Sequence, residues 1–305
     1  STAQGASVEA VLELDEWSGK RRSRANRLLH VARSKPLGSV AAVVLAAIWL
    51  VCLLAGVLAP YGWDDLFTGP KLLAPALGSA HLFGTDQTGR DVLSRVLYGG
   101  RITLLTSLVA TVGGILLASL LGILSGYFLG IFDLAVQRLS DALQALPGLV
   151  VLMVVAAVFR QNPWAVIVVL MVLGAPGAAR VLRSQAIAIR NTPYIEASRA
   201  VGASSARILV QHVLPNIFPL IVVLSTVAVG ANMLILTSLS FLGVIDPSTP
   251  DWGTMLNTAS QQFLTVAPWM AIFPGAAITV SVLGYNLMGD ALRDVLDPRL
   301  RGSRG

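Results

Sequence analysis

Hydrophobic residues in this sequence are concentrated in long uninterrupted runs rather than spread at the spacing of amphipathic helices. An α-helix needs about 20 apolar residues to cross the roughly 30 Å hydrocarbon core of a bilayer. Six runs approach or exceed this length, and their interiors contain no Asp, Glu, Lys or Arg. The pattern predicts an all-α membrane protein with spans at about 39–59, 102–129, 142–159, 163–180, 217–243 and 267–289.

A few residues within or beside these runs predict local features. Pro147, Pro176 and Pro274 are expected to kink or end helices. Arg138 and Asp141 stand three positions apart at the start of the third run, a spacing that predicts an ion pair on one helix face.

The composition supports the membrane assignment. Of the 305 residues, 55% are hydrophobic and 12% are charged, whereas a soluble domain carries about 25% charged residues. The net charge of +6 does not indicate nucleic-acid binding, because the basic residues flank apolar runs instead of forming a groove-facing helix.

The basic residues also predict an orientation. With the N-terminus in the cytoplasm, 17 of the 22 Lys and Arg residues fall in cytoplasmic segments, as the positive-inside rule requires. Both termini are therefore predicted to be cytoplasmic. Acidic residues near the start do not fit a signal peptide, so the first run is expected to be a retained span. We divide the chain into a cytoplasmic segment 1–38, a first span with an extracytoplasmic segment 39–101, a core of five spans 102–290, and a cytoplasmic tail 291–305.

Residues 191–215, on the predicted cytoplasmic side, read as two short helices joined by a tight turn. Thr192 suits the N-cap of the first helix and Pro193 its first position. Glu196 lies early in that helix, where a carboxylate complements the helix dipole. Gly202 can end it in the left-handed conformation.

The second helix of this segment is expected to be capped by Ser204 or Ser205 and to run until Leu214-Pro215. Small residues around the turn would allow another protein's backbone to approach closely. Arg199 and Arg207 would place positive charge around this patch.

This segment resembles the EAA loop of ABC importer permeases. The resemblance rests on Glu196, Ala197, Ser198, Gly202, Leu214 and Pro215, with Ser198 in place of the usual second Ala. Three further stretches resemble the C-type permease of the dipeptide, oligopeptide and nickel branch: 83–91, 240–256 and 289–299.

The resemblance implies a type I importer fold and a set of partners. A second, homologous permease would form a heterodimer with this chain around a shared pathway. Two ATPase subunits holding ATP and magnesium would dock on the EAA loop, through Glu196, Ala197, Arg199 and Gly202 among others. An extracytoplasmic binding protein would deliver the solute to the permease, which would lie in a bacterial inner membrane. Peptides are the expected solute, and nickel chelates or haem are the alternatives.

Other polar residues are weaker candidates. Asn232, Thr237 and Asn286 lie in predicted spans, where polar side chains line pathways or join helices by hydrogen bonds. Asp86, Arg90 and Asp91 precede the second span, and they are candidates for an external gate or a binding-protein contact. The alternative for these three is an ion-paired, self-capped turn. Gly122 and Gly126 form a Gly-x-x-x-Gly pattern that predicts close helix packing.

The sequence offers little for other functions. It lacks the glycine-rich phosphate loop of ATPases, so no bound nucleotide or other cofactor is expected. Three histidines in separate segments and one cysteine do not give metal-ligand spacing, and no catalytic motif is present. A secondary transporter would need ionisable groups for ion coupling, and the predicted spans hold no buried carboxylate. A membrane enzyme would need a catalytic pair within the spans, and we expect a transport subunit instead.

Overall fold

The computed structural model describes residues 36–159, 162–245 and 248–296; the predictions for the two terminal segments lie largely outside this part. The described part is helical, and its one isolated β-bridge joins Thr85 to Asp91. The helices are α3 Pro36–Leu53, α4 Ala55–Leu58, α5 Val92–Phe128, α6 Gly130–Ala145, α7 Gly148–Val158, α8 Pro163–Arg190, α9 Pro193–Ala200, α10 Ser205–Ile208, the π-helical η1 Leu209–Val213, α11 Leu214–Phe241, α12 Trp252–Gln262 and α13 Trp269–Leu296.

Within the described residues, five helical segments are long and apolar enough to cross a membrane, and six if a bent pair counts as one span. The bent pair is α6 and α7, which meet at an angle of 80°. Pro147 is the N-cap of α7, so the break expected at this proline is confirmed. Pro176 and Pro274, by contrast, lie inside α8 and α13, and neither ends its helix.

The second span begins ten residues earlier than predicted, at Val92. Asp91 caps it, because its Oδ2 accepts a hydrogen bond from the Ser94 N–H at 2.8 Å. At 37 residues, α5 is about 55 Å long. It is therefore longer than the bilayer core is thick. Arg95 and Arg101, which were expected in a loop, lie in its first turns. The domain boundary drawn between residues 101 and 102 falls inside this helix.

The two acidic residues of α6 pair with arginines of α8. The predicted Arg138–Asp141 pair is wrong, since Asp141 Oδ1 lies 2.5 Å from Arg180 Nη2. Asp133 binds Arg183 through both carboxylate oxygens, at 2.6 and 2.5 Å. Such two-point pairing satisfies a carboxylate and a guanidinium together, and it joins α6 to α8.

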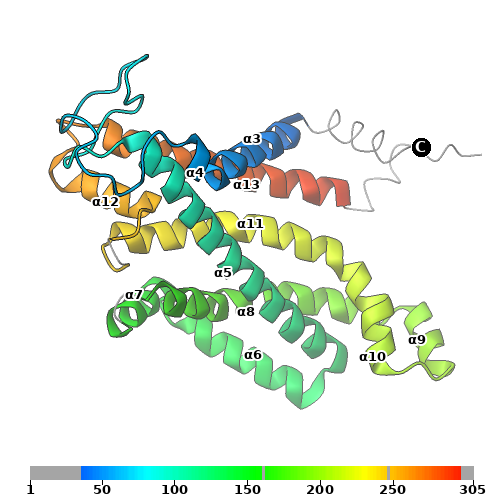
Figure 1. The fold of residues 1–305 in the computed structure, drawn as a ribbon. Coiled ribbons are helices and arrows are strands. Elements are labelled where there is room, and N and C mark those ends of the chain that lie inside the picture. Colours follow the sequence, from blue (N-terminus) through cyan, green and yellow to red (C-terminus); the bar gives the residue numbers. More distant parts are fainter. Residues whose placement is uncertain (1–35, 160–161, 246–247, 297–305) are drawn as a thin grey trace, which may run out of the picture.

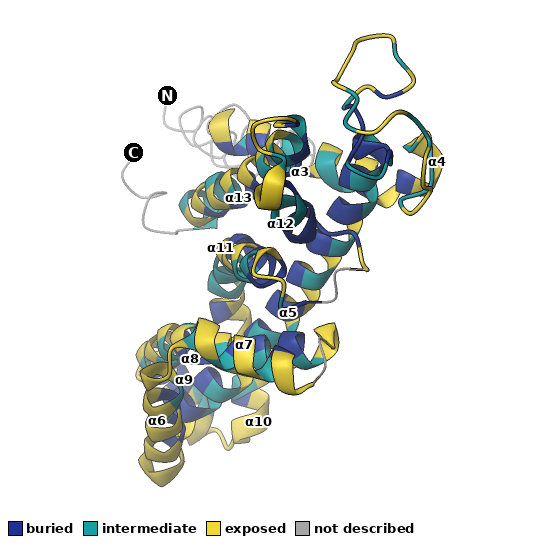
Figure 2. Cartoon of the chain, turned by 90° about the vertical axis from the view of Figure 1, so that its left-hand side faces the viewer, coloured by how far each residue is buried: buried dark blue, intermediate teal, exposed yellow. Residues whose placement is uncertain are grey.

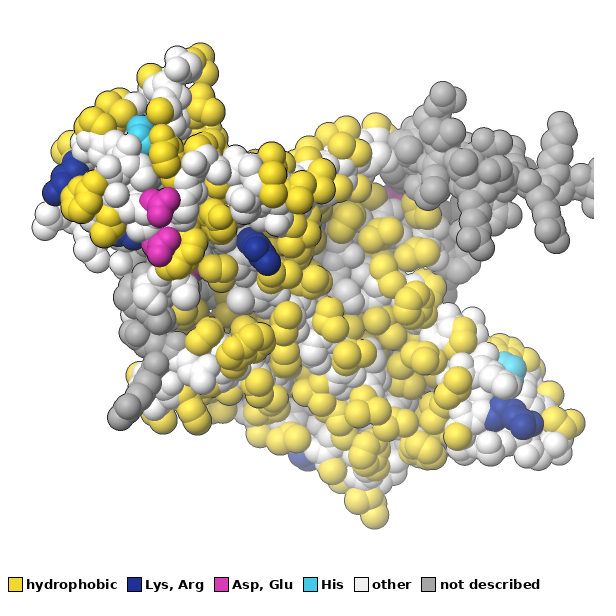
Figure 3. Space-filling view, viewed as in Figure 1, with side chains coloured by type: hydrophobic (Ala, Val, Ile, Leu, Met, Phe, Trp, Pro, Cys, Tyr) yellow, Lys and Arg dark blue, Asp and Glu magenta, His cyan; other side chains and the backbone are white. Residues whose placement is uncertain are grey.

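The two ends of the bundle differ (Figure 1). Helix α12 and the 59–91 segment lie at one end, called here the α12 end. Helices α9 and α10 lie at the other, the α9 end, where α3 begins and α13 finishes. Hydrophobic side chains cover the middle of the face drawn in Figure 3, and charged side chains lie mostly toward its two ends. This distribution matches a bundle that crosses a bilayer from end to end.

Helix α5 packs along α8 over the most extensive helix–helix contact in the described chain. Figure 2 shows the buried positions gathered along α5, whereas α6 is mostly exposed. Gly122 and Gly126 face α8 at the contact. A Cβ atom added at Gly122 would lie 2.4 Å from the Ala179 carbonyl oxygen, and one at Gly126 would lie 2.5 Å from that of Arg183. The predicted packing role of this glycine pair is therefore confirmed.

Replacing Gly122 with Ala is expected to push α5 away from the α8 backbone and to destabilise the protein by about 1–3 kcal/mol, a typical cost of overpacking. Thermal unfolding of the purified transporter in detergent measures the change. Gly174→Ala is the matched control: this glycine lies inside α8, and nothing described lies within 4 Å of an added Cβ. A Gly122→Ala protein that melts with the wild type would contradict the packing argument.

Candidate ATPase-coupling site and a cavity at the opposite end

The segment after α8 forms the two short helices that the sequence predicts. Pro193 occupies the first turn of α9, and Glu196 is the acidic residue of that turn. Thr192 is the N-cap residue with an extended backbone, but its side chain does not cap α9. Its hydroxyl donates instead to the Ile189 carbonyl at 2.6 Å. Helix α8 ends only two residues earlier, and the hydroxyl joins the Thr192 N–H on this carbonyl of its last turn.

Gly202 ends α9 as predicted, with φ of +85°. The Gly202 N–H donates to the Arg199 carbonyl at 2.9 Å, and the Ala203 N–H donates to the Ser198 carbonyl at 3.0 Å. These two bonds form a Schellman motif, which closes the end of a helix and needs a left-handed residue at this position. The turn between α9 and α10 is thus fixed by its own backbone.

Ser204 is the residue that caps α10, because its Oγ accepts the Arg207 N–H at 3.3 Å. The second helix does not end at Leu214-Pro215, and that prediction is wrong. The chain passes through the π-helical turn η1 into α11, and residues Ser205–Phe241 form one apolar helical segment. A π turn shifts the backbone hydrogen-bond register. This shift comes just before Pro215, which has no N–H to donate.

The α9–α10 unit is anchored by two isoleucines. Ile195 and Ile208 are fully buried, and they belong to a core cluster with Tyr127 of α5 and Ala186 of α8. The Arg199 guanidinium lies 5.4 Å from the centre of the Tyr127 ring, within cation–π range. The short helices are therefore held against the ends of two spans.

The opposite face of this unit is open. Val201 is 84% exposed, and nothing described lies within 4 Å of a Cβ added at Gly202. Basic side chains and a histidine are visible at this end in Figure 3. Most of the predicted coupling residues are exposed, with Ser198 half-buried: Glu196, Ala197, Arg199, Gly202, Leu214 and Pro215. Those from Glu196 to Gly202 lie in and just after α9, whereas Leu214 and Pro215 begin α11.

At the α12 end, Asp86 is buried at 4% exposure. Its Oδ1 accepts the Thr88 N–H at 2.8 Å and the Arg90 N–H at 2.9 Å. Its Oδ2 lies 3.2 Å from Arg90 Nε and 3.4 Å from Arg95 Nη1. The carboxylate is thus occupied by its own loop and by α5. Any contact that a binding protein makes here would use Arg90, the most exposed of these charged side chains.

Sequence reasoning missed a histidine in this region. His81 is buried, and its Nδ1 lies 3.0 Å from Asp91 Oδ1 while its Nε2 lies 3.2 Å from the Thr68 carbonyl. Tyr61 stacks on the same ring. Asp91 therefore joins the 59–91 segment to the start of α5, in addition to capping the helix. His81 and Asp91 stand ten positions apart without helical or strand spacing, and no sequence signal indicated this pair.

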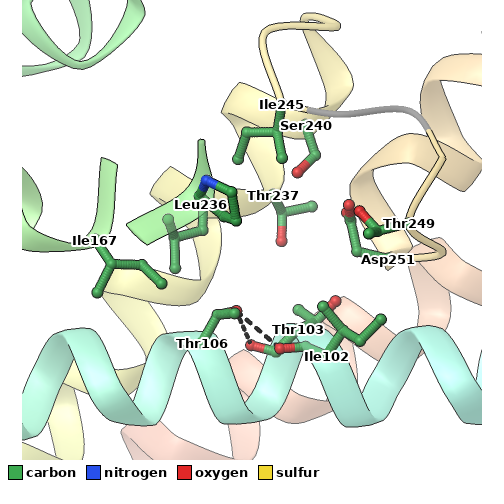
Figure 4. Close-up of a pocket in the computed structure, with 11 residues that line it drawn as sticks. Ile102, Thr103, Thr106, Ile167, Leu236, Thr237, Ser240, Ile245, Thr249 and Asp251 are labelled. Carbon is green, nitrogen blue, oxygen red and sulfur yellow. Dashed lines mark hydrogen bonds between the residues drawn. The ribbon is translucent and has the colours of Figure 1, made fainter. Parts of the chain in front are cut away.

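The three polar candidates within the spans have different surroundings. Asn232 Nδ2 donates to Thr111 Oγ1 at 2.9 Å, which joins α11 to α5. Asn286 is exposed on the surface of the chain. Thr237 is 7% exposed, and its hydroxyl has no hydrogen-bond partner among the described residues. Of the three, Thr237 lines a cavity of about 100 Å³ between α5, α8, α11 and the segment before α12 (Figure 4).

Comparisons with known proteins identify the family to which this chain belongs. Residues 118–302 match the family described as binding-protein-dependent transport system inner membrane component. The chain belongs to this family of permeases. It is similar to the glutathione transport system permease protein GsiD of Pectobacterium atrosepticum, at 38% identity over 79% of this chain and 78% of the relative. GsiD of Escherichia coli O6:K15:H31 is 37% identical over 88% of this chain and 89% of the relative.

Membership decides the general function. The chain is a permease subunit of an ABC importer, not an enzyme, and it has the type I importer fold. As an importer permease of an inner membrane, it works with ATPase subunits and a substrate-binding protein. The sequence-based assignment to the C-type permeases of the dipeptide, oligopeptide and nickel branch is confirmed.

Replacing Ile195 with Ala is expected to weaken the docking of α9 on α5 and α8 by about 2–5 kcal/mol, the range for truncating a buried isoleucine. Faster hydrogen exchange at the α9 amides of the purified transporter would report the loss. Val201→Ala in the same unit is the control, because this side chain is mostly exposed. Equal protection in the two variants would show that Ile195 does not anchor α9.

Proposed function

We propose that this permease imports short peptides and that α9 and α10 couple it to its ATPase partners. The α9–α10 unit carries the coupling proposal, since it is anchored by Ile195 and Ile208 on one face and open around Gly202 on the other. A rigid unit seated in a moving partner transmits that movement to the helices that hold it. Glu196 and Gly202 lie on the face available to such a partner.

The solute proposal is supported by the relatives. Proteins at 37–38% identity over most of this chain are named for glutathione transport, and glutathione is a tripeptide-like solute. We extend this to di- and oligopeptides. Nickel chelates and haem remain the alternatives, and direct uptake measurements separate them.

The proposed assembly pairs this chain with a second, homologous permease in a heterodimer. Two ATPase subunits would hold ATP and magnesium, and this chain would bind no cofactor. Both termini would be cytoplasmic. The ends of α3 and α13 at the α9 end support this orientation (Figure 1), as does the distribution of Lys and Arg along the sequence.

A secondary transporter is the weaker alternative. The expectation that no carboxylate is buried in a span was wrong for Asp133, which is 8% exposed within the α6–α7 pair. A proton carrier must exchange its proton during each cycle. The bidentate bond from Arg183 favours the ionised form of Asp133, so this carboxylate is poorly suited to carry a proton.

Reconstitution of the full transporter in proteoliposomes tests the proposal. The wild type is expected to import a labelled tripeptide only with ATP and the binding protein present. Gly202→Val is expected to reduce ATPase co-purification and uptake about tenfold or more, since a left-handed non-glycine residue costs about 1–2 kcal/mol and a bulky side chain obstructs the open face. Gly202→Asn keeps the turn, because Asn tolerates this conformation. Any loss of co-purification in this variant therefore comes from the side chain on the open face and not from backbone strain.

The control for this experiment is Asp64→Asn, a change at an exposed residue of the α12 end. Normal co-purification, ATP turnover and uptake in Gly202→Val would remove the coupling role. Peptide uptake by the chain without any ATPase would favour the secondary transporter instead.

A further inference from the structure

The cavity at the α12 end is a small, partly polar space inside the permease (Figure 4). Its volume is about 100 Å³, and a water molecule takes about 30 Å³ in the liquid, so it has room for roughly three groups of that size. Ile102, Ile167, Leu236 and Ile245 contribute apolar side chains to its lining. Hydroxyl and carboxylate groups from α5, α11 and the segment before α12 also line it: Thr103, Thr106, Thr237, Ser240, Thr249 and Asp251.

Thr237 shows that this polar lining is incomplete. The residue is 7% exposed and its Oγ1 has no partner among the described residues. A buried hydroxyl without a hydrogen bond costs about 1–3 kcal/mol. Other threonines in buried parts of the spans do not carry this cost; Thr226, on the same helix and also 7% exposed, donates to the Val222 carbonyl at 2.9 Å. The Thr237 hydroxyl lies among the polar lining residues, as Figure 4 shows, and is free to bond a ligand there.

Other polar groups of the wall offer acceptor oxygens. The Thr106 hydroxyl donates its hydrogen to the Ile102 carbonyl at 2.8 Å, so its oxygen keeps lone pairs that accept. Asp251 in its ionised form accepts only. A wall of this kind is complementary to a group with several N–H or O–H donors.

The wall also carries an acidic group without a basic one. Asp251 is 7% exposed and caps α12, its Oδ1 accepting the Gly253 N–H at 2.7 Å and the Thr254 N–H at 3.1 Å. The described residues that line the cavity include no Lys, Arg or His. Burial raises the pKa of the Asp251 carboxyl, and the hydrogen bonds from α12 and Ser240 offset this only in part. A cationic group in the cavity would stabilise the ionised carboxylate.

We propose that this cavity is a subsite for a primary ammonium group, the free amino terminus of a transported peptide. The ammonium would donate to Thr237 Oγ1 and to the acceptor oxygens beside it, facing the Asp251 carboxylate, with its neighbouring carbon against Ile102 and Ile167. The inference rests on the proposed peptide substrate and adds to it which chemical group the permease recognises, and where.

A small probe tests the subsite without the binding protein. Methylammonium is expected to raise the Tm of the purified transporter by a few degrees through binding to the folded state. Tetramethylammonium at equal ionic strength lacks N–H donors and is too large, so it is expected to give no shift. Thr237→Val and Asp251→Asn are each expected to abolish the methylammonium shift. Asn is itself a good N-cap, so Asp251→Asn keeps α12 capped.

The matched control is Thr226→Val, which removes a partnered hydroxyl from the same helix and is expected to keep the shift. Thr237→Val removes an unpaired hydroxyl, so its own Tm is expected to equal or exceed that of the wild type. Four results would overturn the inference: no shift with methylammonium, as for a cavity that holds only water; an equal shift with tetramethylammonium, as for a general salt effect; an equal shift with potassium, as for an inorganic cation site; or a shift that survives in both cavity variants.

Peptide uptake by the reconstituted transporter distinguishes this inference from the proposed function. Thr237→Val and Asp251→Asn are expected to lower the amount of unblocked tripeptide imported per ATP about tenfold, the loss for one hydrogen bond to a charged group. The N-acetylated tripeptide, which has no ammonium, is expected to be imported poorly by the wild type and both variants alike. A wild type that imports neither peptide would refute the proposed substrate. Normal import of the unblocked peptide by both variants would refute the subsite alone.

Discussion

The close contact between α5 and α8 is the constraint on which the rest of the bundle depends. Water does not drive helices together inside a bilayer, so spans associate through close packing and interhelical hydrogen bonds. Gly122 and Gly126 allow α5 to approach the backbone of α8 where any side chain would collide with Ala179 or Arg183 carbonyls. The same two helices then provide the surface under α9, through Tyr127 and Ala186. The position of the α9–α10 unit therefore depends on the tight packing of this pair of spans.

Much of this arrangement could be predicted because the bilayer makes the sequence easy to interpret. Apolar runs located the spans, a Gly-x-x-x-Gly pattern located a close-packing face of the second span, and Gly202 located the turn after α9. Each of these signals is local, since a few neighbouring residues determine hydropathy, close packing or a left-handed backbone. The coupling role proposed for Glu196 came instead from the resemblance to a known family.

The features that sequence reasoning missed depend on residues far apart in the chain. Asp133 and Arg183 are separated by 50 positions, and only the fold of α6 against α8 brings them together. Asp91 starts α5 early because a cap and a histidine contact converge on one carboxylate. The cavity beside Thr237 likewise needs three helices and a connecting segment, and no periodicity along α11 distinguishes this threonine from Thr226. The continuation through η1 was missed because Leu-Pro normally favours a helix boundary.

That continuation matters for how the two ends of the molecule communicate. Residues Ser205–Phe241 form one segment of 37 residues, about 55 Å long if helical throughout. It begins in the α9–α10 unit and carries Thr237 and Ser240 into the cavity wall at the opposite end. A helix end at Leu214-Pro215 would have left a flexible joint between the α9–α10 unit and the spans. With η1 in its place, a displacement of α10 can reach the Thr237 hydroxyl through one covalently continuous helical segment. Between the two sites, Asn232 joins this segment to α5 by a hydrogen bond. A movement of the segment would therefore also displace α5, the span that packs on α8.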